Sequence, residues 1–178
     1  MILVHGGRFN KESWRPQAQS LAESGWRVLA INLRGYGNSR AGAAGDDRYD
    51  LDVLAAVRFA REEGGRAASI LGGSMGATAA AEAACIADAG EIDRMVLLAP
   101  GVVDEPERIK GRKLYIIARD DPNAAGKPRL IRLREQYQRA PEPKRLLVLE
   151  GTAHAQFLFE TDEGPRVMAE IVRFLSSP

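Results

Sequence analysis

The sequence is poor in the residues that build disulfides and metal clusters. A single cysteine and only two histidines occur among its 178 residues. One cysteine excludes a disulfide within the chain and any metal cluster built from several thiolates, and two histidines leave a structural zinc site dependent on an unusual, carboxylate-rich ligand set. We therefore expect neither a metal nor another cofactor, and we expect Cys85 to be a small buried core residue.

The sequence also lacks a large net charge and long apolar runs. Lys and Arg total 25 and Asp and Glu total 24, so the net charge is +1. A nearly neutral chain without a basic tract has no electrostatic reason to bind nucleic acid or an anionic membrane surface. No apolar run approaches the ~20 residues that span a bilayer. The first residues lack the charged segment and long apolar segment of a signal peptide, so we expect a cytoplasmic protein without membrane insertion.

The length and the periodicity indicate one α/β domain over residues 1–178. With 45% hydrophobic and 28% charged residues, the chain has the composition of a globular domain. Short, nearly continuous apolar runs predict strands at 2–5, 27–33, 68–72, 94–99, 113–118 and 145–150. Helical patterns lie between them, at 14–24 with Ser13 as cap, from 46 to 63, at 74–89 and 125–139, and from 161 onward. This alternation predicts a parallel sheet with helices on both faces.

The most informative motif is the run Gly-Gly-Ser-Met-Gly at 72–76, which follows an expected strand and opens an expected helix. This is the context of a G-x-S-x-G nucleophile elbow, a sharp turn that exposes a serine hydroxyl at the end of a sheet. Gly72 and Gly76 keep side chains out of the turn, and the Met75 amide can donate to a developing oxyanion. The alternative is a glycine-rich turn in which Ser74 only caps the helix.

A serine nucleophile needs a base, and only two histidines can supply it. His154 follows the last expected strand, at the end of the sheet where Ser74 also lies, and is the candidate base. His5 is expected instead to be a strand-end histidine bonded to nearby backbone. The glycines that follow it allow close approach of the main chain, and a backbone amide of this loop is the candidate second half of an oxyanion hole.

The base in turn needs an orienting acid, and three aspartates are candidates. Asp121 is favoured because Pro122 restricts it to extended conformations and so fixes its direction. Asp120 is its rival, although capping the turn or pairing with Arg119 suits it better. Asp104, after the preceding strand, is a weaker third candidate.

These motifs together resemble a small α/β-hydrolase of the lid-less serine esterase or lipase type. The matching segments are residues 3–7, 32–39, 72–76, 118–121 and 151–154, in the order that the family has. The resemblance implies a nucleophile after the middle strand and hydrolysis of an ester, thioester or amide. It places the second oxyanion amide at Gly7 or Arg8, favours Asp121 as the acid, and assigns Arg34 and Tyr36 to fold support.

The small size of the chain bears on the site and the substrate. The chain starts at what is usually the family's third strand, so the resemblance implies about six strands. Residues 101–112 leave no room for the cap domain that many members insert. We expect Gln156 and Phe157 to shape an open acyl pocket. The expected activity is cleavage of small or short-acyl carboxylic esters by a monomer or small homo-oligomer. Thioesterase, amidase and perhydrolase activity, or a binding protein of low turnover, are the alternatives.

Overall fold

A single parallel sheet forms the centre of the computed structural model, which describes residues 1–42, 46–65 and 67–177. Within these ranges six strands lie in the order β2-β1-β3-β4-β5-β6, and every neighbouring pair is parallel. Their bounds are β1 (Ile2–Val4), β2 (Leu29–Ile31), β3 (Ala68–Gly73), β4 (Ile92–Leu98), β5 (Arg112–Ala118) and β6 (Lys144–Leu149). The prediction of a six-stranded parallel sheet is confirmed.

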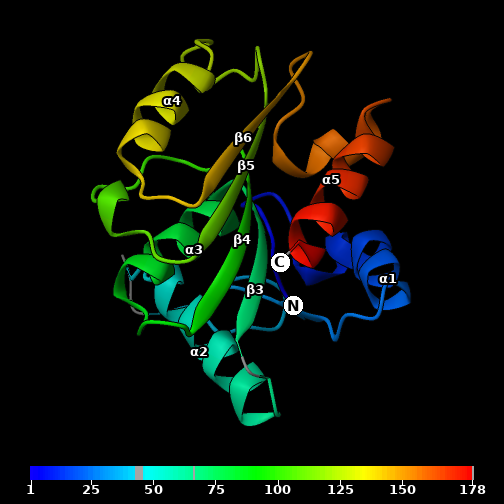
Figure 1. Ribbon diagram of the computed structural model, residues 1–178, viewed down its shortest axis with the longest axis vertical. Coiled ribbons are helices and arrows are strands. Elements are labelled where there is room, and N and C mark those ends of the chain that lie inside the picture. The colour runs from blue at the N-terminus through cyan, green and yellow to red at the C-terminus, as the bar shows by residue number, and fades with distance from the viewer. Residues whose placement is uncertain (43–45, 66, 178) are drawn as a thin grey trace.

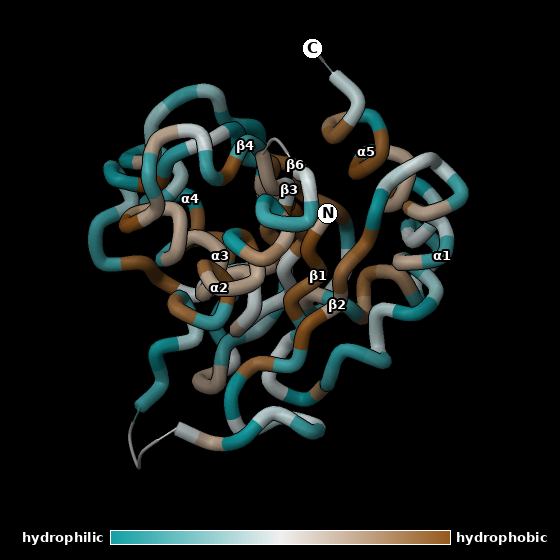
Figure 2. Tube along the Cα trace, turned by 90° about the horizontal axis from the view of Figure 1, so that it is seen from below, coloured by the Kyte–Doolittle hydropathy of each residue, from teal (hydrophilic) through white to brown (hydrophobic). Residues whose placement is uncertain are grey.

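Helices cover both faces of the sheet (Figure 1). One face carries α1 (Arg15–Glu23) and α5 (Gly164–Ser176), and the other carries α2 (Tyr49–Glu62), α3 (Met75–Ile86) and α4 (Leu130–Arg139). Three short 3-10 helices, η1 (Lys11–Trp14), η2 (Pro106–Arg108) and η3 (Ala155–Glu160), lie in connecting segments. Seen from below, hydrophobic strand segments occupy the centre and hydrophilic segments the periphery (Figure 2). This is the arrangement expected for strands covered on two faces.

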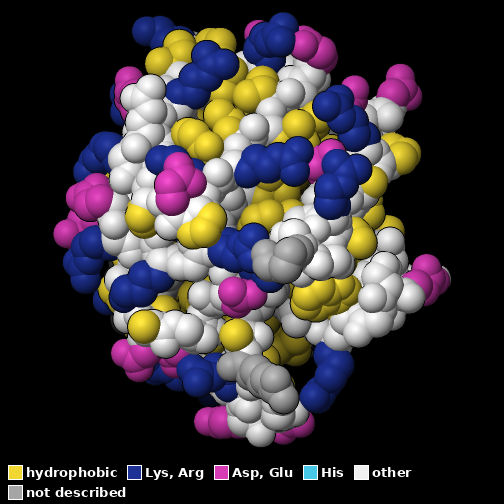
Figure 3. Space-filling view, viewed as in Figure 1, with side chains coloured by type: hydrophobic (Ala, Val, Ile, Leu, Met, Phe, Trp, Pro, Cys, Tyr) yellow, Lys and Arg dark blue, Asp and Glu magenta, His cyan; other side chains and the backbone are white. Residues whose placement is uncertain are grey.

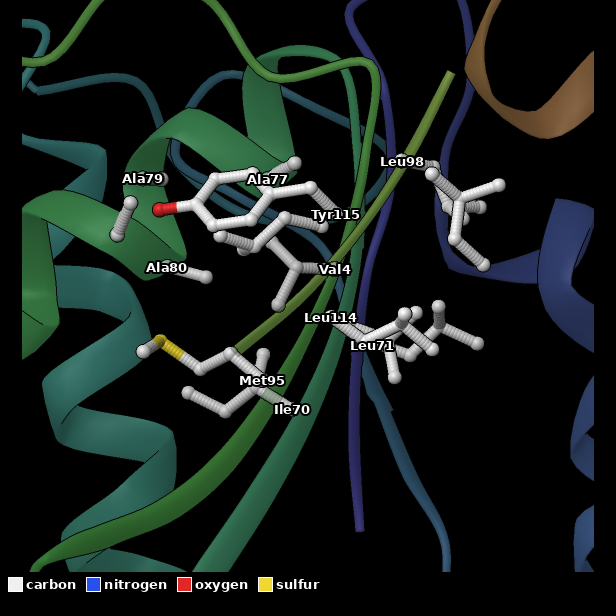
Figure 4. Packing of buried hydrophobic residues seen from close by; sticks show 14 of the residues in the cluster. Val4, Ile70, Leu71, Ala77, Ala79, Ala80, Met95, Leu98, Leu114 and Tyr115 are labelled. Carbon is white, nitrogen blue, oxygen red and sulfur yellow. The ribbon is translucent and has the colours of Figure 1, made fainter. Parts of the chain in front are cut away.

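The core fixes α3 against the middle of the sheet. Successive β3 side chains point to opposite faces, Ile70 toward α3 and Leu71 away from it (Figure 4). Ala77, Ala79 and Ala80 of α3 are at most 1% exposed. Because their side chains are small, the helix axis can approach the sheet closely, which holds the start of α3 at the end of β3.

Several helix boundaries differ from the sequence prediction, including the end of α3 at Ile86 rather than 89 and the start of α5 at Gly164 rather than 161. Ser13 is not a cap: the chain enters through η1, where Asn10 Oδ1 accepts from the Glu12 amide at 3.1 Å. Helix α2 begins at Tyr49 rather than at residue 46. Helix α4 begins at Leu130 rather than at 125, because residues 122–129 fold back on themselves through an antiparallel bridge between Pro122 and Pro128.

The carboxyl ends of the strands carry no separate cap domain. The connection between β4 and β5 contains only η2 as regular structure and lies wholly within the described residues. No helix in the described part of the chain is long and apolar enough to cross a bilayer. Positive and negative side chains are interspersed over the face seen in Figure 3, as the balanced composition suggests.

Candidate active site

The elbow holds Ser74 in a backbone conformation that residues with side chains rarely adopt. Ser74 lies between β3 and α3 with φ 50° and ψ −114°. Its amide donates to Leu98 O at 2.8 Å, and its carbonyl accepts from the Thr78 amide at 2.9 Å. A Cβ on Gly72 would lie 2.6 Å from Gly76 O, and one on Gly76 would lie 2.6 Å from His5 O. Both glycines are therefore required for the turn that lifts the Ser74 hydroxyl above the sheet.

A continuous chain of hydrogen bonds joins three side chains from three different loops. Ser74 Oγ lies 2.8 Å from His154 Nε2, and His154 Nδ1 lies 2.7 Å from Asp121 Oδ2. A carboxylate can only accept, so Nδ1 carries the hydrogen and Nε2 has the lone pair that accepts from the serine hydroxyl. The Ser74 side chain makes no cap hydrogen bond to α3. Its hydroxyl is therefore poised to lose a proton to the imidazole.

Among the three candidate acids, the fold brings Asp121 to the imidazole. Its side chain is fully buried, and its carbonyl accepts from the Arg129 amide at 2.8 Å. The neighbouring Asp120 is exposed, with its amide bonded to Gly151 O at 3.0 Å, and Asp104 is exposed on the loop after β4. The expected pairing of Asp120 with Arg119 is wrong, because Arg119 pairs with Glu150 at 2.7 Å.

One oxygen of the buried acid has only a distant partner. Asp121 Oδ1 accepts no hydrogen bond within the described residues, and the nearest cation is the Arg129 guanidinium, whose Nε lies 3.6 Å away. The same Nε donates to Pro122 O at 3.2 Å. The Arg129 guanidinium thus lies near the carboxylate and offsets part of the free-energy cost of burying its negative charge.

Residues from two segments bring candidate backbone donors to the cavity that contains Ser74. Met75 begins α3, so its amide has no acceptor inside the helix, and the helix N-terminus favours negative charge. Gly7 and Arg8 form the corner of a turn that the Phe9 amide closes on Gly6 O at 3.0 Å. Both residues line the same cavity as Ser74 and Met75. The arrangement can therefore place two donors around an oxyanion at this point.

Gln156, which was expected to shape the acyl pocket, contacts the loop after β1. Gln156 is buried and is absent from the described lining of the cavity. Its Oε1 accepts from the Gly6 amide at 2.8 Å, while Nε2 donates to Ser13 Oγ at 2.9 Å. The side chain is oriented toward the loop after β1 and holds it, which residue type and spacing alone gave no means of detecting.

The cavity at the end of the sheet has a volume of about 690 Å³. Phe157 lines it as expected, and its ring packs on Phe9 with centroids 5.3 Å apart. Sequence reasoning missed the contributions of the β5 and β6 loops, which are Asn123, Ala124, Thr152 and Ala153. Their position after parallel strands at the ligand-binding edge was the available signal. Within the described residues, no group of three or more His, Cys, Asp or Glu side chains could hold a metal ion.

Arg34, Tyr36 and Cys85 were expected to have structural roles, and the structure shows what each of them contacts or where it is buried. Arg34 pairs with Asp52 at 2.7 Å and also with Asp46, which ties the loop after β2 to α2. The Tyr36 ring packs on His5 at 4.9 Å. Cys85 is buried on α3, and burial raises the pKa of its thiol to about 11. The thiol is therefore kept protonated and unreactive.

Comparisons with known proteins agree with this architecture. A family model described as the alpha/beta hydrolase fold matches residues 1–127. A protein of Rattus norvegicus named "Putative protein-lysine deacylase ABHD14B" is 29% identical over 173 residues, covering 92% of this chain and 78% of that protein. An esterase of Pyrococcus furiosus superposes with a TM-score of 0.81 at 21% identity, over 98% of this chain and 80% of the other. A monoacylglycerol lipase of Paleococcus ferrophilus gives a TM-score of 0.77 at 16% identity, over 98% and 92%. Because the family model spans more than half of the sequence, the chain belongs to the alpha/beta hydrolase fold family.

Proposed function

We propose that this hydrolase cleaves carboxylic esters of small or short-acyl substrates through a Ser74–His154–Asp121 triad. The observation that carries the proposal is the pair of hydrogen bonds from Ser74 Oγ to His154 Nε2 and from His154 Nδ1 to Asp121 Oδ2. A serine, a base and an orienting acid in this geometry are the parts of an acyl-transfer site.

The reaction proceeds in two halves. Ser74 Oγ attacks the acyl carbon while His154 Nε2 takes the hydroxyl proton, and Asp121 stabilises the imidazolium that forms. The amide of Met75, together with that of Gly7 or Arg8, holds the oxyanion. Collapse expels the alcohol, which takes the proton from His154 and leaves the acyl group on Ser74. A water molecule then repeats the attack with His154 as base, and the carboxylic acid departs.

The shape of the cavity supports small substrates. Its walls come from loops after the strands, the first residue of α3 and part of η3, and no separate cap domain covers it. The His154 side chain remains 29% exposed, so the reacting atoms are close to solvent. The lining is mainly apolar, with the Phe9–Phe157 pair as its main aromatic wall, but without a cap domain a long acyl chain would extend from the cavity into solvent.

The direct test is Ser74→Ala measured with short p-nitrophenyl esters. We expect kcat/KM to fall by several orders of magnitude, because the covalent route is removed. A fluorophosphonate probe should label the folded wild-type protein and not the variant. Intact turnover in Ser74→Ala would refute the proposal, and failure of Ser74 to label in folded protein would favour the binding-protein alternative.

Amide cleavage is the second candidate, and the relative named as a lysine deacylase favours it. The same three side chains serve either reaction, since His154 can protonate a leaving amine as well as an alcohol. Turnover of an acetyl-lysine peptide and of a matched acetyl ester by the same preparation separates the two. A higher kcat/KM for the peptide would assign the site to deacylation.

A further inference from the structure

The described lining of the candidate active-site cavity contains more positively than negatively charged side chains. Its described lining includes one carboxylate, Asp121, and two guanidinium groups, those of Arg8 and Arg129. Asp121 is fully buried and bonded to His154, so it has little capacity to neutralise a second cation. The lining therefore has an excess of positive charge, although the chain as a whole is nearly neutral.

The two arginines differ in what they contact. Arg129 lies against Asp121 and donates to Pro122 O, so part of its charge is already compensated. Arg8 is exposed and, within residues 1–42, 46–65 and 67–177, has no hydrogen-bond or ion-pair partner. Its guanidinium is the described charged group of this cavity that is left without a counter-charge.

Arg8 and Ser74 line the same cavity from loops that follow adjacent strands. Arg8 follows β1, which pairs directly with β3, the strand that ends in Ser74. Arg129 follows β5, on the other side of β3. The cavity at Ser74 therefore has one arginine from the loop after β1 and one from the loop after β5, and Gln156 holds the first of these loops through Gly6.

We propose that the Arg8 side chain binds an anionic group, such as a carboxylate, carried by the substrate next to its scissile bond. A guanidinium matches a carboxylate with two parallel hydrogen bonds. A concave site with low-dielectric walls strengthens this attraction relative to an open surface. The proposal rests on the proposed function and narrows its substrate class from esters in general to esters with a negative charge on the acyl or the alcohol part.

The first experiment compares matched substrates in wild type, Arg8→Gln and Arg8→Lys. One pair differs in the acyl part, p-nitrophenyl butyrate against p-nitrophenyl hemisuccinate. The other differs in the alcohol, phenyl butyrate against 4-carboxyphenyl butyrate. For at least one pair, Arg8→Gln should lower the ratio of anionic to neutral kcat/KM by about tenfold, and Arg8→Lys should retain most of it. Each ratio cancels any effect of the substitution on the Arg8 backbone amide.

Two controls separate a local contact from a general charge effect. Arg166→Gln removes a positive charge from the exposed surface of α5, outside the described lining, and should leave both ratios unchanged. Added salt should weaken the preference of the wild type for the anionic ester. Equal ratios in wild type and Arg8→Gln for both pairs would overturn the proposal, as would an equal loss of both substrates in a pair.

The second experiment does not depend on turnover. In Ser74→Ala protein, calorimetry gives the affinity for phenyl butyrate and 4-carboxyphenyl butyrate, with and without Arg8→Gln, and the acyl pair is measured in the same way. Tighter binding of an anionic ester that is lost with Arg8→Gln supports the anion site, even if the wild type hydrolyses no ester. That combination of results would refute the proposed esterase function but not the anion site. No preference in either pair overturns the anion site, whatever the wild type hydrolyses.

Discussion

The two histidines of the chain occupy similar places in the sheet but have opposite surroundings. His5 follows β1 and His154 follows β6, both at the carboxyl end of the strands. His5 is fully buried, with Nδ1 bonded to Gly6 O at 2.9 Å and Nε2 accepting from the Leu33 amide at 3.2 Å. His154 is partly exposed and bonded through both ring nitrogens to side chains. Position at the sheet edge therefore does not determine the role of a histidine. The hydrogen-bond partners of its ring nitrogens do.

The partners also decide what each ring can do with a proton. Backbone groups hold His5 in one neutral tautomer, because Nε2 must keep a lone pair for the Leu33 amide. Protonation there breaks a hydrogen bond and charges a buried ring. His154 contacts a hydroxyl, from which it takes a proton in the proposed reaction, and its other ring nitrogen is bonded to a carboxylate. The surroundings of His5 therefore resist protonation of the ring.

Replacing His154 should have the largest effect on activity and a small effect on stability. His154→Gln keeps a polar side chain in a half-buried place but removes the general base. We expect kcat/KM for a short ester to fall by at least about a thousandfold. The urea midpoint should stay within experimental error of the wild type. A large loss of stability in this variant would show that His154 resembles His5 more than the geometry indicates.

Replacing His5 should reverse that pattern. His5→Leu keeps the volume but leaves the Leu33 amide and Gly6 O without their ring partner in a buried place. Gly6 O keeps the Phe9 amide as a donor, whereas the Leu33 amide is left unpaired at a cost of about 1–3 kcal/mol. The free energy of unfolding, measured in urea, should fall by that order, while Ser74 remains reactive toward a fluorophosphonate in the folded fraction. A fully stable variant without activity would contradict this assignment.

Sequence reasoning predicted backbone partners for His5 and Asp121 as the partner of His154, but it did not find the contacts that hold the surrounding loops. Strand periodicity and the 72–76 motif predicted the parallel sheet and the neighbourhood of Ser74, since both depend on local pattern. The contact of Gln156 with the Gly6 amide joins residues 150 positions apart. The position of Arg129 near Asp121 Oδ1, which accepts no hydrogen bond in the described residues, depends on how residues 122–129 fold back. No local pattern encodes either, because both result from tertiary packing.

Breaking the contact between Gln156 and the loop after His5 should have a smaller effect on activity, and the effect should fall on kcat. Gln156→Leu removes the acceptor of the buried Gly6 amide, at a cost of about 1–3 kcal/mol in stability. The loop that carries the Gly7 and Arg8 amides then loses an anchor, so kcat should fall by about tenfold with little change in KM. Gln156→Asn serves as the matched control, since it keeps the amide group but falls short of Gly6. If it restores kcat fully, the contact with Gly6 is not what positions the loop.

The smallest expected effect is the pH dependence of stability that His5 creates. Burial lowers the pKa of His5 below the ordinary value of 6.5, so the unfolded chain binds this proton before the folded chain does. The stability contributed by His5 is therefore complete above 6.5 and decreases as the pH falls below it, until the folded chain also binds the proton. His154→Gln protein contains His5 as its single histidine. Compared with His154→Gln/His5→Leu between about pH 7.5 and about pH 5.5, it should show the steeper loss of unfolding free energy. Parallel pH profiles in the two proteins would mean that the buried ring accepts its proton as readily as a histidine in the unfolded chain.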